Sequence, residues 1–445
     1  MTWVTDPARG GDAVPAVDAR TTLDDGIVGV GADGSAAVTR VRRRTITVLA
    51  CAQVLGGLAA GSMVSVGSLL AVELSGSDAW AGSVTTAATL GAALAALWLA
   101  RLAVAHGRRR SLAVGLALAS AGAVGVVVAA VLESFGLLLV AAVLMGVGSA
   151  ASLQSRFAAT DLSTPATRAR DLSLVVWAGT VGAVAGPNLV RLDAPVARLT
   201  GLPELTAVFV FAAAGTLAAL LVVQIGLRPD PLDVVGRDGP AAGRRPRVPL
   251  RVAVTTLRRH PRAVGALVGI LVAHAVMVAV MSMTPVHMTG HGATVQLVGL
   301  TVSLHIGAMY ALSPVMGLVA DHAGPRSVLV GGLVLVVTAA GVCAVAGGDH
   351  GVVTAGLVLL GLGWSGATVA GSSIIAGDVS GPERVAVQGL SDSLMSLAGA
   401  GGGALAGVGL ALIGYGGLAV VSAWVGVAGL LAVLLISRRA ALLPA

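Results

Sequence analysis

The chain has 445 residues, of which 56% are hydrophobic and 11% are charged. Because soluble domains carry about 25% charged residues, this composition excludes a soluble globular protein and indicates a polytopic membrane protein. The net charge of +7 comes from 28 basic residues, all arginines in short polar segments beside apolar runs, so no nucleic-acid partner is expected.

The first half of the chain begins with a polar segment, residues 1–39, that is rich in Asp, Ala and Gly and predicts a disordered cytoplasmic tail. Residues 40–227 then contain six apolar runs of about 20 residues, the length of a membrane-spanning helix. We expect them to form an amino-terminal six-helix bundle. The runs lie at 40–70, 79–100, 111–131, 136–155, 172–190 and 206–227.

A polar segment with nine arginines, residues 228–262, separates the two halves and predicts a cytoplasmic linker. Within it, Leu250 to Leu257 is typical of a short amphipathic helix at the membrane interface. Residues 263–437 are expected to form the carboxy-terminal bundle, and 438–445 a short tail. The six apolar runs of this half lie at 263–288, 294–319, 327–347, 351–376, 386–412 and 416–437.

The arginines provide an independent test of this twelve-span topology. If both termini are cytoplasmic, all but two of the 28 arginines face the cytoplasm, and only Arg191 and Arg198 face outward. Cytoplasmic loops of membrane proteins are enriched in arginine in this way. An odd number of spans would place one basic terminus outside, so the pattern predicts an even count in a bacterial plasma membrane.

The loops of the two halves resemble one another. The segment Asp161-Leu-Ser-Thr-Pro165 after the fourth run matches Asp378-Val-Ser-Gly-Pro382 after the tenth. Basic loops likewise follow the second and eighth runs. Six plus six spans with matching loops indicate a parallel duplication about an axis along the membrane normal.

One of these loops carries a family resemblance. The segment from Gly317 through Asp321 and Gly324 to Arg326 resembles the G-x-x-x-D-R-x-G-x-R loop of the major facilitator superfamily, with His322 in place of the first arginine. The resemblance implies two pseudo-symmetric six-helix bundles, alternating access, and a gating role for these four residues. The first-half copy of the loop has Val104 where Asp321 would align, so the implied charged network is expected to be lopsided.

The fifth apolar run contains Gly182, Gly186 and Pro187, which resemble a G-x-x-x-G-P motif of drug antiporters in this superfamily. The physical basis of such a motif is close helix packing through small residues and a proline bend. A generic packing role accounts for the motif equally well.

Methionine and histidine concentrate between His274 and Met316, which hold six of the ten methionines and four of the eight histidines. Two pairs are spaced four residues apart, so each pair lies on one helical face. Thioether and imidazole ligands suit Cu(I), whereas methionine also fills gaps between helices. The residue pattern leaves both interpretations open. The pairs are Met277 with Met281 and His305 with Met309, and His274, Met288 and Met316 extend the stripe as accessory candidates.

The M-x-x-x-M and H-x-x-x-M pairs resemble those of the copper-importing, CcoA-like or CalT branch of the superfamily. That resemblance implies that Met277, Met281, His305 and Met309 bind Cu(I) as a transported substrate, and no resident cofactor is expected. Relatives of the branch are linked to other substrates, including riboflavin. The alternative is therefore proton-coupled transport of a small organic solute, with the stripe serving as packing.

Asp392 is the only carboxylate clearly inside an apolar run, near the start of its helix. We expect it to interact with the helix dipole and water; the alternative is a proton-coupling site. Asp161 and Asp171 are expected to pair in loops with Arg156, Arg168 or Arg170. The chain has no phosphate-binding G-x-x-x-x-G-K-[ST] motif, which argues against ATP hydrolysis, and no enzyme activity is predicted. The expected partners are the lipid bilayer and a small-molecule or metal-ion substrate, bound by a monomer.

Overall fold

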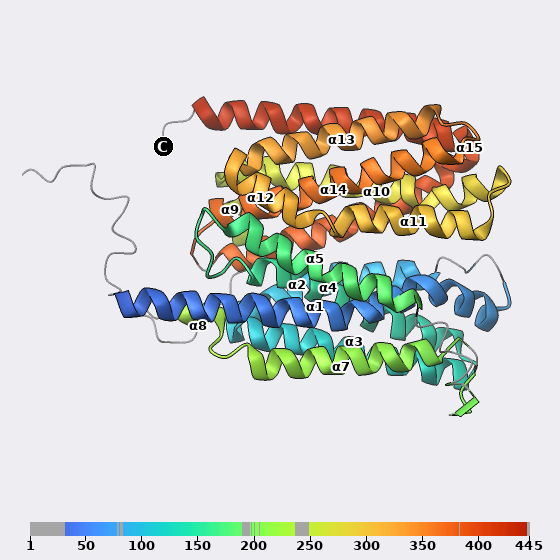
Figure 1. Cartoon of the computed structure of the whole chain (residues 1–445), viewed down its shortest axis with the longest axis horizontal. Helices are drawn as coiled ribbons and strands as arrows, with labels where there is room; N and C mark the ends of the chain where they lie inside the picture. Colours follow the sequence, from blue (N-terminus) through green and yellow to red (C-terminus); the bar gives the residue numbers. More distant parts are fainter. Residues whose placement is uncertain are drawn as a thin grey trace, which may run out of the picture. The chain divides into compact units, whose positions relative to one another are not determined.

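The described elements are all α-helices in the computed structural model of this chain (Figure 1). Within the described residues, nine helical stretches are long and apolar enough to cross a membrane. The prediction of an all-α, polytopic membrane protein is confirmed. Most of the predicted tail 1–39, the outward Arg191 and the last three residues lie outside the description. The structure describes residues 32–77, 80, 83–188, 196, 198–199, 201–203, 205–235, 249–381 and 383–442.

Each apolar run of the first half corresponds to one helix. The first helix begins earlier than expected, because residues 32–39 contain several alanines and no proline and therefore extend the helix toward the amino terminus. The helices are α1 (Ala32–Ser75), α2 (Ser83–His106), α3 (Arg108–Val131), α4 (Phe135–Ala158), α5 (Arg168–Asn188) and α7 (Ala207–Gly226).

The second half follows two short helices and departs twice from the expected spans. The last two spans form one continuous helical run with a non-helical residue at Gly414, where φ is 68° and ψ is 177°. The span at 294–319 is divided into two helices. The elements are α8 (Pro231–Val235), α9 (Leu250–Arg259), α10 (Pro261–Gly290), α11 (Val295–Tyr310), α12 (Ser313–Ala323), α13 (Pro325–Val345), α14 (His350–Asp378) and α15 (Glu383–Leu442).

Proline explains the break between α11 and α12. Pro314 lies in the first turn of α12 and has no N–H to donate to the Tyr310 carbonyl, so a continuous helix would lose this bond. The Ser313 hydroxyl lies 2.7 Å from that carbonyl oxygen instead. The Tyr310 carbonyl oxygen therefore still accepts a hydrogen bond at the break.

Glycine allows the helices within each bundle to approach closely. A Cβ on Gly91 of α2 would collide with the Val143 carbonyl of α4, and one on Gly146 of α4 would collide with the Ala88 carbonyl of α2. In the second half, a Cβ on Gly332 would meet the Gly363 carbonyl oxygen at 2.8 Å. Small residues at such crossings let backbones pack in van der Waals contact, which drives helix association inside a bilayer.

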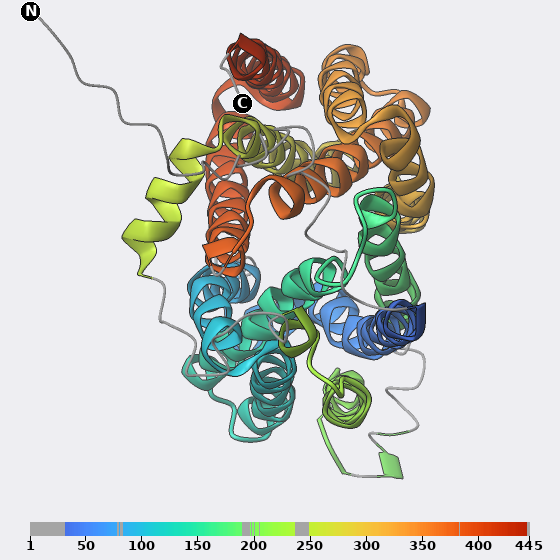
Figure 2. The same cartoon turned by 90° about the vertical axis from the view of Figure 1, so that its left-hand side faces the viewer.

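The two bundles meet through two pairs of helices. The first part of α15 lies beside α2, and α12 lies beside α5 (Figure 2). The polar contacts between the bundles gather near one end of the helices, where Arg108, Asp161 and Arg384 lie. We call this end the basic end.

The predicted short amphipathic helix is confirmed as α9, which extends to Arg259. Its Ala253 and Leu257 are buried, and the helix packs on α10 and α15. Arg251, Arg258 and Arg259 are exposed on it. The helix therefore covers part of the second bundle with an apolar face and presents arginines outward.

Candidate functional site

A buried ion pair joins the two bundles. Arg156 lies in the last turn of α4 and is 2% exposed, and Asp392 lies on α15 and is fully buried. The Arg156 Nη2 donates to Asp392 Oδ1, and Met395 Sδ lies 4.0 Å from the same nitrogen. Among the described residues, Arg156 Nε and Asp392 Oδ2 have no hydrogen-bond partner. A buried polar atom without a hydrogen bond is costly, so a ligand that bonds to either atom would be stabilised there. Each partner can therefore bind a third group.

This environment corrects two expectations. Asp392 was expected to interact with water at its helix start, but it lies nine residues after Glu383, the first residue of the helical run, and has no exposed surface. Arg156 was expected in a loop pair with Asp161 or Asp171, but it belongs to α4 and pairs across the bundles. The Asp392 carboxylate is compensated by a guanidinium because burial of an unpaired charge is prohibitive.

A cluster of aromatic side chains of the second bundle lies near Arg156. The Trp364 Nε1–H of α14 donates to His274 Nδ1 of α10 over 2.9 Å. The Tyr310 ring of α11 packs edge-on against Trp364, with centroids 5.6 Å apart. Arg156 lies near enough for its charge to act on both His274 and Tyr310. The His274 ring fits beside α15 because Gly399 has no side chain; a Cβ there would lie 2.7 Å from Nε2.

We call Arg156, Asp392, His274, Tyr310 and Trp364 the central site. It combines a guanidinium, which binds carboxylates and other planar acceptors, with a carboxylate that can hold a proton. The aromatic rings offer faces for stacking and polar edges for orientation. Sequence reasoning found His274 and Asp392 but missed the other three. An arginine at the end of an apolar run is an ordinary feature, and so is an aromatic residue within one. Their role becomes apparent only when the structure shows which residues they contact.

A second charged cluster lies at the basic end. Arg108 of α3 is 1% exposed and donates to Asp161 through Nε at 2.8 Å and Nη2 at 3.3 Å. The same Nη2 donates to Gln388 Oε1 of α15 at 2.6 Å, and Arg384 Nη2 donates to Asp161 at 3.0 Å. Asp161 thus joins the bundles through two arginines, neither of which was the expected partner. Asp171 pairs with Arg42 at 3.0 Å and lies 3.9 Å from the expected Arg170.

The predicted gating loop contacts the other bundle. Asp321 accepts hydrogen bonds from the backbone N–H groups of Ala169 (3.0 Å) and Arg170 (2.9 Å) in the first turn of α5. A carboxylate at a helix amino terminus also interacts favourably with the helix dipole. Gly317 lies against Ala169 and Ser173, where a Cβ would collide with both. Gly324 ends α12 with φ of 85°, and Arg326 is exposed at the start of α13.

The first-half counterpart of this contact is apolar. Val104 is 4% exposed and packs in a cluster with Ala100, Ala103 and Val385. Val385 lies near the start of α15, where a carboxylate at 104 would approach the helix as Asp321 approaches α5. The expected asymmetry between the two loop copies is therefore observed: Val104 makes an apolar contact, whereas Asp321 makes a charged one.

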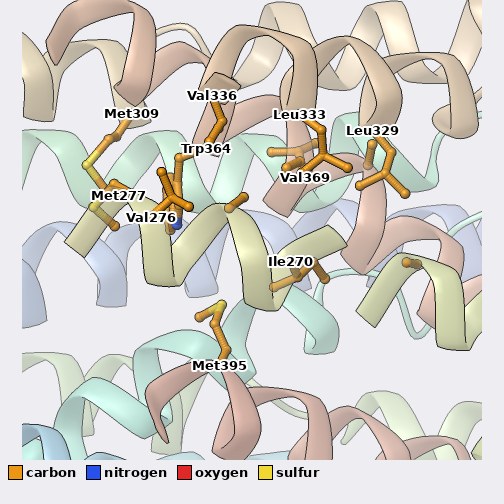
Figure 3. Close-up of a cluster of buried hydrophobic side chains, with 14 of the residues drawn as sticks. Ile270, Val276, Met277, Met309, Leu329, Leu333, Val336, Trp364, Val369 and Met395 are labelled. Atoms are coloured by element: carbon orange, nitrogen blue, oxygen red, sulfur yellow. The ribbon is translucent and has the colours of Figure 1, made fainter. Parts of the chain in front are cut away.

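The methionines of the predicted metal stripe lie in one large apolar core of the second bundle. Met277, Met288 and Met309 are buried there, and Met281 and Met316 pack against it. Figure 3 draws the thioethers of Met277 and Met309 directed toward each other. No group of three or more His, Cys, Asp or Glu side chains able to hold a metal occurs in the described ranges.

The histidines of the stripe have separate environments. His305 is buried, and its Nδ1 lies 2.6 Å from the Leu357 carbonyl oxygen of α14, whereas Nε2 has no partner among the described residues. His274 belongs to the central site. Of the stripe's sulfurs, those of Met277 and Met309 face each other, and the imidazoles of His274 and His305 make polar contacts with α14.

Of the predicted packing motif on α5, Gly182 lies directly against α1, where a Cβ would collide with the Val54 carbonyl and approach Gly57. The surroundings of Gly186 and Pro187 lie outside the description, although both residues belong to the α5 helix. The close approach at Gly182 is the kind of contact that the packing interpretation predicts.

A two-bundle membrane fold with a buried, charged site between the bundles is typical of solute carriers. The comparisons agree. The model of the Major Facilitator Superfamily matches residues 49–304. The uncharacterized MFS-type transporter YdeG of Bacillus subtilis is 38% identical over 88% of this chain and 90% of its own length. The chain belongs to the Major Facilitator Superfamily, and it is a secondary transporter rather than an enzyme.

One further relative and one solved structure are also similar to this chain. The riboflavin transporter RfnT of Brucella anthropi is 30% identical over 79% of this chain and 85% of its own length. The crystal structure of the human organic anion transporter MFSD10 superposes with a TM-score of 0.70 at 17% identity, over 88% of this chain and 99% of that one. These relatives give no support to the narrower copper-importing branch, so Cu(I) binding stays a prediction.

Proposed function

We propose that this transporter carries a small organic solute with an anionic or strongly hydrogen-bond-accepting group, coupled to proton movement, across the bacterial plasma membrane. The observation that carries the proposal is the ion pair of Arg156 and Asp392, which spans the two bundles and leaves one polar atom on each residue without a hydrogen-bond partner among the described residues. A solute acceptor group would bind Arg156, and Trp364 and Tyr310 would hold its planar part.

The pair also provides a route for coupling. While Asp392 is charged, it holds Arg156 and links the bundles. A proton on Asp392 removes that attraction, so Arg156 becomes available to the solute and the bundles can separate. Deprotonation after solute release would restore the link. Differential stabilisation of two conformations by proton and solute is what alternating access requires.

The relatives support an organic solute. RfnT is named for riboflavin, a planar molecule with acceptor groups, and MFSD10 is described as an organic anion transporter. Both chemistries suit a guanidinium flanked by aromatic rings. Under this proposal the basic end is cytoplasmic, as are the linker 228–262 and both tails, because arginines favour that side. The structure then corresponds to a carrier closed toward the cytoplasm.

Transport by the purified full-length chain in proteoliposomes tests this function. The assay follows riboflavin and a panel of aromatic carboxylates, with and without an imposed proton gradient. We expect Asp392→Asn to abolish gradient-driven accumulation while solute exchange at equal pH persists, and Arg156→Gln to lose both. Asp349→Asn changes an exposed carboxylate that caps α14, so this control should keep both activities. Unchanged gradient-driven uptake in Asp392→Asn would overturn the coupling.

Import of Cu(I) is a second proposal, favoured by one observation. Because a carbonyl oxygen only accepts, the His305 contact with Leu357 assigns the proton to Nδ1 and leaves a lone pair on the unpartnered Nε2. Metal-ligating histidines are commonly oriented in this way. Met277, Met281 and Met309 would supply the sulfurs.

Copper accumulation in cells, measured by mass spectrometry, separates the two proposals. If Cu(I) is the cargo, Met281→Leu and His305→Ala should each eliminate copper accumulation. Leucine preserves apolar volume, so the packing interpretation predicts little effect of Met281→Leu. Retained uptake of an organic solute by Met281→Leu, with no copper phenotype, would reject the metal site.

A further inference from the structure

A groove on the first bundle lies apart from both charged clusters. It has a volume of about 380 Å³ and runs between α2, α3 and α7 at the basic end. Its floor is apolar and includes Leu102, Val114, Ala117 and Leu220. The transport function proposed above uses none of these residues.

The surroundings of the groove face hydrocarbon rather than water. The same helices expose large apolar side chains nearby, including Leu217 and Leu221 on α7, which are 49% and 53% exposed. On a helix that crosses a membrane, such residues contact lipid chains. An apolar groove that opens on this surface is therefore filled by an acyl chain or by a comparably apolar group.

The rim at the basic end carries one arginine and one histidine. His106 ends α2, Arg110 lies in the first turn of α3, and both are exposed and line the groove. In the part of the chain that the structure describes, no carboxylate forms an ion pair with Arg110. Among the described residues, no counter-ion keeps the guanidinium from binding an anion at the level where the membrane-spanning helices end.

We propose that this groove binds one anionic phospholipid. Its phosphodiester would lie on Arg110 and His106, and one acyl chain would lie along Ala117 and Leu220. Charge complementarity selects this occupant, because basic pockets between membrane-spanning helices suit anionic headgroups. The bound lipid would hold the first turn of α3, which also supplies Arg108 to the Asp161 cluster. Lipid binding thereby stabilises the closed basic end.

Native mass spectrometry of the delipidated full-length protein tests the proposal. Dioleoyl phosphatidylglycerol and dioleoyl phosphatidylcholine are titrated separately. We expect one phosphatidylglycerol to bind at least fivefold more tightly than phosphatidylcholine. Arg110→Gln should abolish the preference for phosphatidylglycerol. Ala117→Phe places a large side chain from an exposed residue into the groove, so it should weaken binding of phosphatidylglycerol. Arg101→Gln removes an exposed arginine of α2 that does not line the groove, so it should retain the wild-type preference.

Three outcomes would overturn the proposal. The first is equal binding of the two lipids by the wild type. The second is an equal loss of preference in Arg110→Gln and Arg101→Gln, which would indicate a diffuse effect of net charge. The third is competition by millimolar inorganic phosphate with no effect of Ala117→Phe, which would indicate an anion site without an acyl chain. Circular dichroism and thermal melting of each variant verify that the fold is retained.

Discussion

The two contacts between the bundles close the same end of the molecule with different chemistry. Where α2 meets α15, the loop position is apolar Val104, and the neighbouring Asp161 binds the guanidinium groups of Arg108 and Arg384. Where α5 meets α12, Asp321 binds two backbone N–H groups. At the basic end, each half contributes one of these two carboxylates from a different place: Asp161 follows α4, and Asp321 lies in the last turn of α12. Both halves therefore place a carboxylate at the basic end, but the two carboxylates do not occupy equivalent positions of the repeat.

The difference also predicts unequal strength. Asp161 is buried and compensates arginine charges, whereas Asp321 is half-buried and interacts with a helix terminus. Removing one partner of a buried pair leaves an uncompensated charge, while losing a terminal carboxylate removes a smaller, solvent-screened attraction. We therefore expect the α2–α15 side to control opening of the basic end.

Asp161→Asn should have the largest effect. It leaves the buried guanidinium of Arg108 without a counter-ion, so the closed state should lose about 3–5 kcal/mol. Spin labels at the exposed Thr164 and His322, one in each half, would report a longer distance between the bundles. Asp349→Asn serves as the control. An unchanged distance distribution in Asp161→Asn would show that the cluster does not hold this end closed.

Gly389→Ala should have an intermediate effect. A Cβ at this position of α15 would collide with the Ala100 side chain of α2, so the helices must move apart. Overpacking of a close contact costs about 1–3 kcal/mol. Gly401→Ala on the same helix has no atom within 4 Å of the added Cβ and provides a matched control. The melting temperature and the spin-label distance should change only in Gly389→Ala.

Asp321→Asn should have the smallest effect of the three. Asparagine keeps one acceptor for the α5 amides and loses the charge, so the closed state should lose about 1 kcal/mol. The reduction should shrink further at high salt, because the loop is partly exposed to solvent. A larger loss than in Asp161→Asn would reverse the ranking of the two contacts.

The sequence predicted the fold well because membrane spans are long and chemically uniform. Each apolar run was readable within a few tens of residues, and the arginine bias and matching loops needed only a comparison along the chain. The central site was harder, because Arg156 and Asp392 are 236 residues apart and only the fold brings them together. Asp392 was identifiable since a carboxylate within an apolar run is unusual. Arg156 was assigned to a loop because polar residues follow it closely.

The methionine stripe illustrates a different limit. Periodicity correctly placed Met277 and Met281 on one face of α10, but a face does not specify what lies opposite. In the structure that face borders a large apolar core that also holds Met309. The aromatic residues were missed because Trp364 and Tyr310 resemble ordinary core residues in the sequence. Their polar role becomes apparent only from the hydrogen bond of the Trp364 indole N–H to His274.

The break between α11 and α12 divides one membrane span into two segments with different attachments. The α11 segment packs on α14 through His305, and α12 packs on α5 of the other bundle through Gly317. Ser313 lies at the joint, 3.1 Å from the Ser173 carbonyl oxygen of α5. Because no helical hydrogen bond from Pro314 crosses the joint, it can bend at low cost. Under the proposed function, the transport cycle would then include an occluded intermediate, in which α12 still seals the basic end while α11 and Tyr310 have already shifted around the solute.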